Sequence, residues 1–262
     1  SDHVTFRNIE STAGAFVTSA SDVSAIGGSV GPGVNYSPEI KDDGGSSLPP
    51  RRILFDGVIF HDWTRNDNSS HVDCLHVMAV DGFVLRNSRF RNCEIFDVLF
   101  TRFGTTGSPR NVVVENNFFS CCRSGYYSLL LANGHGEQWS NFLIRNNSTD
   151  KPMSLGEGST TARSRVVFRG NIGPYFNTLD CRAPGVSWDY NVWASGGRCG
   201  AHDMIAPSDF TDAGRQDFHL RPGAAAVRRG DPRSHPPSDI DGEPRPTARP
   251  DAGADQLRQP RS

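Results

Sequence analysis

The densest group of residues that could do chemistry lies between positions 61 and 76. It consists of His61-Asp62-Trp63 and, ten residues further on, His71-Val72-Asp73-Cys74-Leu75-His76. Histidine titrates near neutral pH and a carboxylate can orient its ring, so these residue types suit general acid/base catalysis. If Leu75 and Val77 point inward from a strand, Asp73 and His76 project outward from it. The alternative is that these polar side chains are merely solvated on an outer face.

Proton abstraction from a sugar acid also needs a positive charge near the substrate's carboxylate. The chain has only two lysines, Lys41 and Lys151, so a lysine base has few candidates. Arg102 is a candidate partner for a uronate carboxylate, because a guanidinium can bind a carboxylate with two hydrogen bonds. The candidate catalytic residues are His71, Asp73, His76 and Arg102, and the candidate substrate-binding residues are His61, Trp63 and His135.

Two other functions use different residues. Glycoside hydrolysis needs two carboxylates, about 5 Å or about 6.5–9.5 Å apart. Asp73 and Asp97 could stand on adjacent coils of a parallel structure, about 4.8 Å apart at the backbone. A non-catalytic binding module would instead stack exposed aromatic side chains, such as Trp63, Trp139 and Tyr126, on sugar rings.

No cofactor is predicted from the sequence. The six cysteines lack the spacing of a zinc site, and calcium binding stays open although no D-x-D-x-D loop is present. We expect one or two disulfides, with Cys181–Cys199 as the best local pair, or else buried free thiols. Motifs for nucleotide binding and for a serine nucleophile are missing from the sequence.

The charge and hydropathy of the sequence argue against nucleic acid as a partner and against a membrane-spanning helix. The formal net charge of −2 provides no global field that would attract nucleic acid. A run of about 18 apolar residues, which a membrane-spanning helix requires, does not occur. Residues 1–20 lack the apolar core of a secretion signal, so we expect any such signal to have been removed.

The elements that would position these residues form an internal repeat. A phrase with apolar residues at its second and fourth places starts at 3, 22, 52, 82, 111, 141, 165 and 185, in steps of 19 to 30 residues. Clear copies are Gly82–Phe90 and Asn111–Phe119. The period of two predicts strands with one buried face, and the steps predict one solenoid coil each. A second strand in each coil is predicted at 75–77, 98–100, 129–131, 153–155 and 179–181, which gives an outward row of His76, Leu99, Leu130, Ser154 and Asp180.

An asparagine follows the apolar pair in four consecutive copies, at Asn117, Asn147, Asn171 and Asn191. Asparagine tolerates a left-handed corner, and its amide can both donate to and accept from the next coil. This column resembles the asparagine ladder of the pectate-lyase-like superfamily of right-handed parallel β-helices. The resemblance implies an all-β solenoid of about eight coils, secreted or at the cell surface and active on polysaccharide. A β-sandwich is the alternative, but it would not keep the phrase through four copies.

The repeat ends near Gly200, which predicts a β-helix over 1–200 and a C-terminal capping segment and tail over 201–262. The tail includes Asp217–Val227, Asp239–Pro246 and Asp251–Asp255, and it resembles the closing segment of many bacterial secreted β-helix proteins. A polar cap is missing before the strand at His3, so we expect a missing segment or a partner to cover the first coil.

The expected function is that of a polysaccharide lyase-like or epimerase-like enzyme on acidic polysaccharide. The segments 31–50, 61–71 and 102–109 leave the repeat, and such excursions usually build the binding face of a solenoid. The alternatives are the binding module and the hydrolase, since a fold does not by itself fix a function.

Overall fold

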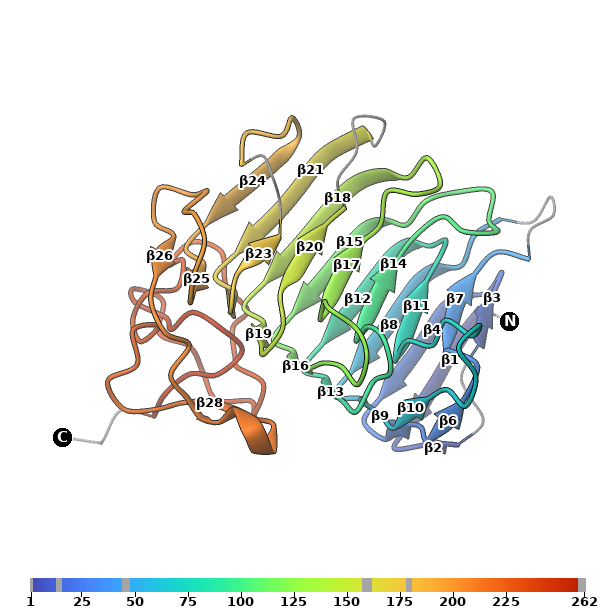
Figure 1. The fold of residues 1–262 in the computed structure, drawn as a ribbon, viewed down its shortest axis with the longest axis horizontal. Helices are drawn as coiled ribbons and strands as arrows, with labels where there is room; N and C mark the ends of the chain where they lie inside the picture. Colours follow the sequence, from blue (N-terminus) through green and yellow to red (C-terminus); the bar gives the residue numbers. More distant parts are fainter. Residues whose placement is uncertain (1, 13–15, 44–47, 157–161, 178–180, 259–262) are drawn as a thin grey trace.

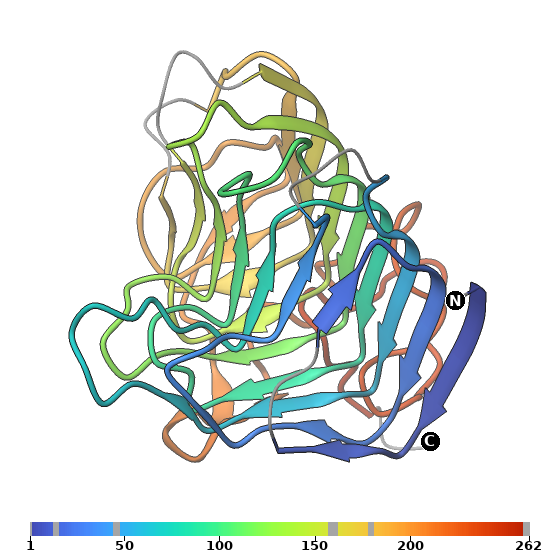
Figure 2. The ribbon, with the colours of Figure 1, turned by 90° about the vertical axis from the view of Figure 1, so that its right-hand side faces the viewer.

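The chain folds into a parallel β-solenoid of about eight coils, as the repeat predicts. The computed structural model describes residues 2–12, 16–43, 48–156, 162–177 and 181–258, and these contain no α-helix. Three parallel sheets run the length of the molecule, each taking one strand from successive coils (Figure 1). Figure 2, which looks along the stack from the N-terminal side, shows the sheets as the sides of each coil. The described residues form no helix long and apolar enough to cross a membrane.

The sheets are named by the order in which a coil visits them. Sheet A contains β1 (Asp2–Arg7), β4 (Ser21–Ile26), β8 (Arg51–Asp56), β12 (Asp81–Arg86), β15 (Arg110–Glu115), β18 (Gln138–Arg145), β21 (Ala162–Arg169) and β24 (Val186–Asp189). Sheet B contains β2 (Glu10–Ser11), β5 (Ser29–Val30), β9 (Ile59–His61), β13 (Arg89–Arg91), β16 (Phe118–Ser120), β19 (Ser148–Thr149), β22 (Ile172–Gly173), β25 (Val192–Trp193) and β26 (Met204–Ile205). Sheet C contains β3 (Phe16–Thr18), β7 (Glu39–Lys41), β11 (Leu75–Val77), β14 (Val98–Phe100), β17 (Leu129–Leu131), β20 (Met153–Leu155) and β23 (Phe176–Asn177).

The predicted strands of sheet A pair in parallel and in register. Val112 lies between Phe83 and Phe142, which are its partners on the two neighbouring strands. Val114, the next inward-facing residue of β15, likewise lies between its partners on the two neighbouring strands. These side chains are at most 1% exposed and belong to one continuous apolar core. Because each coil contributes only a few apolar residues, the core exists only when the coils are stacked.

The asparagine ladder is confirmed, and the structure shows how it ends. Each Nδ2 donates to the next Oδ1, at 2.9 Å from Asn117 to Asn147, 3.0 Å from Asn147 to Asn171 and 3.0 Å from Asn171 to Asn191. Asn191 donates in turn to Oδ1 of Asp203, at 3.0 Å, and Asp203 therefore closes the ladder. At the other end, the backbone N–H of Ser88 donates to Oδ1 of Asn117.

The expectation that the ladder asparagines themselves take the left-handed corner conformation is wrong. The left-handed residue is the one before each ladder position, with φ of 53° at Asn116 and 50° at Asn146, and glycine takes the same place at Gly170, with φ of 64°. The ladder residues themselves are not left-handed and are fully buried. Their side chains are therefore selected for hydrogen bonding to neighbouring coils, while the preceding residue makes the turn.

Four of the five second strands predicted from the sequence are present in sheet C, at β11, β14, β17 and β20. The exception is the last, since Met153 pairs with Phe176 of β23, earlier in the chain than 179–181. Leu179 and Asp180 lie outside the described residues. The strand residue in register with Ser154 is Asn177 rather than Asp180.

The C-terminal segment covers the outer face of sheet B from β16 to β25. A second apolar cluster joins strand residues Phe118, Ile172 and Val192 to tail residues such as Phe218 and Ile240. Two short antiparallel strands, β27 (Phe210–Asp212) and β28 (Asp217–Leu220), flank the 3-10 turn η1 (Ala213–Arg215). The tail therefore covers one side of the solenoid as well as following its last coil (Figure 1).

The six cysteines are paired. Cys181–Cys199 is confirmed as a disulfide, and Cys74–Cys93 is a second one, with Cα atoms 5.2 Å apart, that the sequence did not indicate. The remaining pair is formed by the neighbours Cys121 and Cys122. Disulfides are typical of proteins from extracellular or otherwise oxidising compartments.

Candidate functional site

A cleft of about 660 Å³ lies over the outer face of sheet C. Its floor is the outward row of β11, β14 and β17, where His76, Leu99 and Leu130 are in register. Glu39 of β7 extends this row on the N-terminal side of His76. The remaining lining residues include Lys41, His71, Met78, Phe96, Thr101, Phe103, Asn133 and His135.

The strand β11 faces its histidine into the cleft because its neighbours in sequence are apolar. Leu75 and Val77 are at most 1% exposed and join the core, so His76 between them points outward. The approach to the strand is fixed by the disulfide at Cys74.

Asp73 is held in place by two hydrogen bonds, one to the Ser37 side chain and one from the backbone of Phe96. Its backbone N–H donates to the hydroxyl of Ser37 at 2.8 Å, and its Oδ1 accepts from the backbone N–H of Phe96 at 3.2 Å. These bonds leave Oδ2 directed at the histidines.

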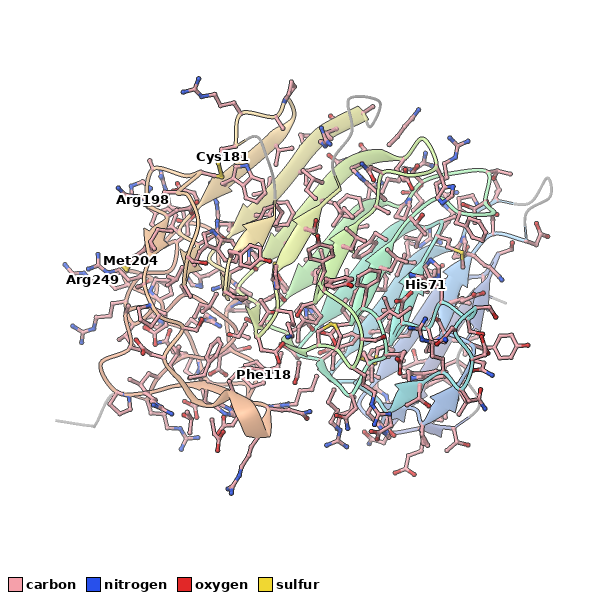
Figure 3. The ribbon with its side chains drawn as sticks, viewed as in Figure 1. His71, Phe118, Cys181, Arg198, Met204 and Arg249 are labelled. Carbon is pink, nitrogen blue, oxygen red and sulfur yellow. A yellow bond between two sulfur atoms is a disulfide. The ribbon has the colours of Figure 1, made fainter. Side chains whose placement is uncertain are left out.

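His71 and Asp73 form an ion pair at the edge of the cleft. Nδ1 of His71, which Figure 3 labels, is 3.1 Å from Oδ2 of Asp73. The Asp73 side chain has no exposed surface, whereas 51% of the His71 side chain is exposed. Interaction with the Asp73 carboxylate raises the pKa of His71, although partial burial opposes it. The arrangement gives an accessible imidazole with a buried carboxylate behind it, which is suited to proton transfer.

His76 has the opposite electrostatics. Its Nδ1 is 3.9 Å from Asp73 Oδ2, and its ring centroid is 6.2 Å from that of His71. Burial lowers its pKa despite the nearby carboxylates of Asp73 and Glu39. Its Nε2 is buried and has no hydrogen-bond partner among the described residues. Two neighbouring imidazoles thus differ in the direction of their pKa shifts, a pattern typical of acid/base sites.

The cleft also contains Lys41, which the sequence offered only as one of two lysines. Its Nζ is 2.5 Å from Oε2 of Glu39, and both residues lie on β7. The pair places a cation close to the two histidines. Sequence reasoning missed it because the excursion at 31–50 hid the short strand β7.

The wall on one side is built by the segment after β14 and the segment after β17. Phe103 is 59% exposed and meets the ring of His135 at 5.1 Å, edge to face. Glu137, which is fully buried, accepts from the hydroxyl of Thr101 and from the backbone N–H of His135. The excursion at 102–109 thus contributes to the cleft as expected, together with a second one at 132–137 that was not singled out.

Arg102 lies behind this wall. Its guanidinium donates to the carbonyl oxygens of Gly136 and Thr106, and Arg102 does not line the cleft. Among the candidate catalytic residues, the structure therefore brings together His71, Asp73 and His76 but leaves Arg102 in a neighbouring loop.

Two of the candidate binding residues lie elsewhere. His61 is at the end of β9 in sheet B, with Nδ1 2.7 Å from Oδ2 of Asp62. Trp63 is 1% exposed because β10 (Trp63–Thr64) pairs with β6 (Gly33–Val34) and its indole donates to the carbonyl of Val30. The expectation of an exposed Trp63 is thus wrong, and so is that of Trp139, also 1% exposed, whereas Tyr126 is 75% exposed.

The pair of carboxylates considered for hydrolysis does not reach the cleft surface. Asp73 and Asp97 are both 0% exposed. Burial raises the pKa of Asp97 well above its ordinary value, and the carboxylate of Asp150 raises it further. Asp97 therefore lies inside the coil, where burial disfavours its charged form.

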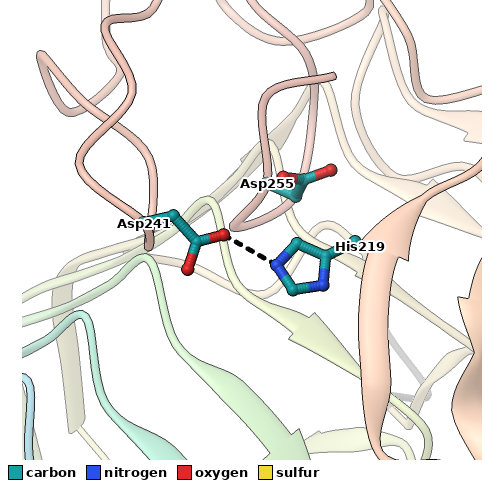
Figure 4. A group of neighbouring side chains, drawn as sticks. All are labelled: His219, Asp241 and Asp255. Carbon is teal, nitrogen blue, oxygen red and sulfur yellow. Dashed lines mark hydrogen bonds and ion pairs between the residues drawn. The ribbon is translucent and has the colours of Figure 1, made fainter. Parts of the chain in front are cut away.

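The described residues contain one cluster with the composition of a metal site, and it is far from the cleft. His219, Asp241 and Asp255 place one ligand atom each within 4.8 Å of one another (Figure 4). Both ring nitrogens of His219 already face carboxylates, with Nε2 2.7 Å from Asp241 Oδ2 and Nδ1 bonded to Asp217. Asp241 also pairs with Arg89 of β13, which ties the tail to the solenoid.

Comparison of the sequence with protein-family models and with curated proteins finds no match. The chemistry of the cleft is therefore the basis for assigning a function. It combines the His71–Asp73 ion pair, a second imidazole, one lysine and an apolar floor on a parallel sheet.

Proposed function

We propose that the cleft binds acidic polysaccharide and that His71, oriented by Asp73, transfers a proton in a lyase-like or epimerase-like reaction. The observation that carries this proposal is the His71–Asp73 pair at the edge of an open cleft. The asparagine ladder of this chain resembles that of the pectate-lyase-like superfamily, which supports a role in acting on polysaccharide. The disulfides agree with a secreted or cell-surface location.

The reaction needs three groups around a uronate ring. A base removes the hydrogen on the carbon next to the carboxylate, and a cation lowers the cost of the negative charge that develops. In a lyase the electron pair then forms a carbon–carbon double bond while the bond to the adjoining glycosidic oxygen breaks and that oxygen takes up a proton. In an epimerase the same carbon is reprotonated on the opposite face.

His71 is the best base in the cleft because it is accessible and its pKa is raised. Lys41 is the candidate for the cation in place of Arg102, because Lys41 lines the cleft, paired with Glu39, and Arg102 does not. His76 forms the floor beside His71, and burial lowers its pKa, which favours the neutral imidazole.

Sugar rings also need apolar contact. Leu99 and Leu130 form the floor beyond His76, and Phe103 stands exposed on one wall. These side chains suit the C–H faces of sugar rings, and His135 beside Phe103 adds a polar group to that wall.

A non-catalytic binding module is the second candidate, and one observation favours it. Tyr126 is 75% exposed next to Tyr127, and Tyr127 stacks on Phe96 of the cleft at 6.1 Å. An aromatic row that continues out of the cleft could hold a glycan without any reaction.

Incubation of the purified protein with polygalacturonate, alginate and neutral glycans tests the proposal. Both the ultraviolet absorbance of unsaturated uronates and the reducing ends are followed, together with uptake of solvent deuterium at the acidic sugar. We expect absorbance or deuterium uptake with an acidic glycan, and its loss in His71→Ala. His3→Ala is the matched control, because His3 also faces a carboxylate, 3.9 Å from Asp22, on the far N-terminal coil.

The outcomes separate the candidates. Reducing ends without absorbance would indicate hydrolysis and contradict the proposal. Binding of an acidic glycan with no turnover would favour the binding module. Turnover that survives in His71→Ala would place the reaction elsewhere on the molecule.

A further inference from the structure

Four arginines line a second cleft, at the C-terminal end of the solenoid. This arginine cleft has a volume of about 420 Å³, and its arginines are Arg198, Arg228, Arg229 and Arg249. A cavity of about 440 Å³ next to it is lined by Val227 and three of the same arginines. Figure 3 shows Arg198 and Arg249 together at the opposite end of the molecule from His71. Each volume falls within the roughly 300–1,000 Å³ typical of ligand sites.

We propose that the arginine cleft binds the carboxylate or sulfate groups of an acidic glycan, as a site separate from the cleft over sheet C. The choice of a glycan rests on the proposed function, whereas the anionic character of the ligand rests on the arginines alone.

The backbone fixes two of the arginines side by side. The N–H of Gly230 donates to the carbonyl of Pro250 at 2.8 Å, and the N–H of Ala252 donates to the carbonyl of Ala226 at 3.0 Å. A side chain at Gly230 would meet the carbonyl oxygen of Asp251 at 2.5 Å, so the two segments touch backbone to backbone. Arg229 and Arg249 are consequently held next to one another by the tail itself.

The third arginine comes from a different segment and is also anchored. Arg198 precedes Cys199, which is bonded to Cys181. The next turn is closed by Asp203, whose Oδ2 accepts from the backbone N–H groups of Cys199 and Gly200 at 3.2 and 2.7 Å. The loop that carries Arg198 is therefore tied to the last coil of the solenoid, opposite the tail.

Within the part of the chain that the structure describes, three of the four guanidinium groups in the arginine cleft keep an unpaired positive charge. Among the described residues, Arg198, Arg229 and Arg249 have no ion pair and no side-chain hydrogen bond. Two carboxylates of the segments that carry these arginines are bonded to other groups. Asp203 bonds to the ladder and its own turn, and Asp251 accepts from the backbone N–H groups of Arg228 and Leu257. The cleft thus keeps its positive charge in a protein whose formal net charge is −2.

The shape and chemistry favour the acidic groups of a sugar chain. Arginine binds carboxylate and sulfate oxygens with paired hydrogen bonds, and it stays charged at every physiological pH. Tyr190 and His202 stack at 4.4 Å and form an aromatic wall beside the arginines, against which a sugar ring can lie. Asp189 holds the His202 ring, with Nδ1 3.0 Å from its Oδ2. The adjoining cavity shares Arg228, Arg229 and Arg249, so successive acidic residues of one chain can be held. A glycan bound at the arginine cleft and at the cleft over sheet C at the same time would gain avidity without a new contact.

The test measures binding to polygalacturonate and to dextran sulfate by titration calorimetry at low salt and at about 0.15 M salt. The variant R198Q/R229Q/R249Q is compared with R7Q/R165Q/R215Q, which removes three exposed arginines elsewhere and the same net charge. We expect the first variant to weaken binding about tenfold or more and the second to change it less than about twofold. Both measurements are repeated in the His71→Ala background.

Several results would overturn the proposal. Equal weakening in the two variants would show a general charge effect, and no weakening in the first would remove the arginine cleft as a site. Inorganic phosphate or sulfate, or a DNA duplex, that binds with the same arginine dependence while both glycans fail would assign the cleft to that ligand instead. Because the measurement is binding, its result stands whether or not the cleft over sheet C turns over a substrate.

Discussion

Oδ2 of Asp73 lies 3.1 Å from Nδ1 of His71, and the carboxylate is fully buried while the imidazole is half exposed. Removing the negative charge of Asp73 without changing its shape should therefore lower the pKa of His71 toward its ordinary range. The Asp73→Asn variant keeps an oxygen that can accept from Phe96. A proton NMR titration of the His71 ring checks this, and an unchanged midpoint would show that the pair is not electrostatically coupled.

The same pair predicts how turnover depends on pH. His71 must be neutral to act as a base, and its pKa is raised, so the rate should increase as the pH rises through that value and then level off. In Asp73→Asn the rising limb should move to lower pH, with a smaller maximal rate, because the base is weaker. A pH–rate profile of both proteins on the same acidic glycan measures the shift. Identical profiles would assign the titration to another group.

The cleft histidines predict a loss of activity without loss of folding. His76→Ala and Asp73→Ala should each abolish turnover of the glycan that the parent protein uses. We expect the melting temperature to change little in His76→Ala, since Nε2 of His76 makes no hydrogen bond within the described chain. His3→Ala should keep full activity. Full activity in both cleft variants would move the site elsewhere.

The asparagine ladder predicts a specific stability loss. Oδ1 of Asn147 accepts from the backbone N–H and the Nδ2 of Asn117, and its own amide donates to Val114 and Asn171. Asn147→Ala would leave these buried groups unpaired and should lower the free energy of unfolding by about 1–3 kcal/mol. Asn68→Ala, at an exposed position, should change it by less than about 0.5 kcal/mol. Chemical denaturation measures both, and equal effects would contradict the ladder's role.

Asp150 predicts a stability that falls as the pH rises. Burial raises its pKa from 3.8 to about 7, so the folded protein binds a proton that the unfolded chain has lost between those values. Because folding requires this proton uptake, the free energy of unfolding decreases as the pH rises from about 4 to about 7. Asp150→Asn keeps the acceptor for the backbone N–H of Cys121 and should melt higher than the parent at pH 8, with no difference near pH 4.

Asp67 serves as a control, because its pKa is shifted in the opposite direction to that of Asp150. Hydrogen bonds from Ser69 and Ser70 lower its pKa to about 2, so its contribution is present above about pH 4 and is lost as the pH falls. Asp67→Asn should therefore melt slightly lower than the parent at neutral pH. Melting temperatures that rise in both variants would show that neither shift governs stability.

The repeat and the ladder could be predicted because both arise from short-range chemistry. A residue such as Val112 is buried or exposed according to the period of a strand, and this period is visible in the sequence. Asn147 lies at a fixed place after its strand, so its column could be aligned by inspection. The two ends of the ladder, Ser88 and Asp203, broke the asparagine pattern and were not found.

The chain sequence by itself therefore determined the all-β solenoid, the apolar interior and the outward direction of His76. Only the tertiary structure decided which outward residues meet. Coils differ in length, so the turns between strands set which residues share a row, and this placed Glu39 beside His76. Long-range pairing buried Trp63 against β6, and packing of the tail on sheet B brought Arg229 toward Arg198. Such contacts depend on segments far apart in the chain, which no local pattern encodes.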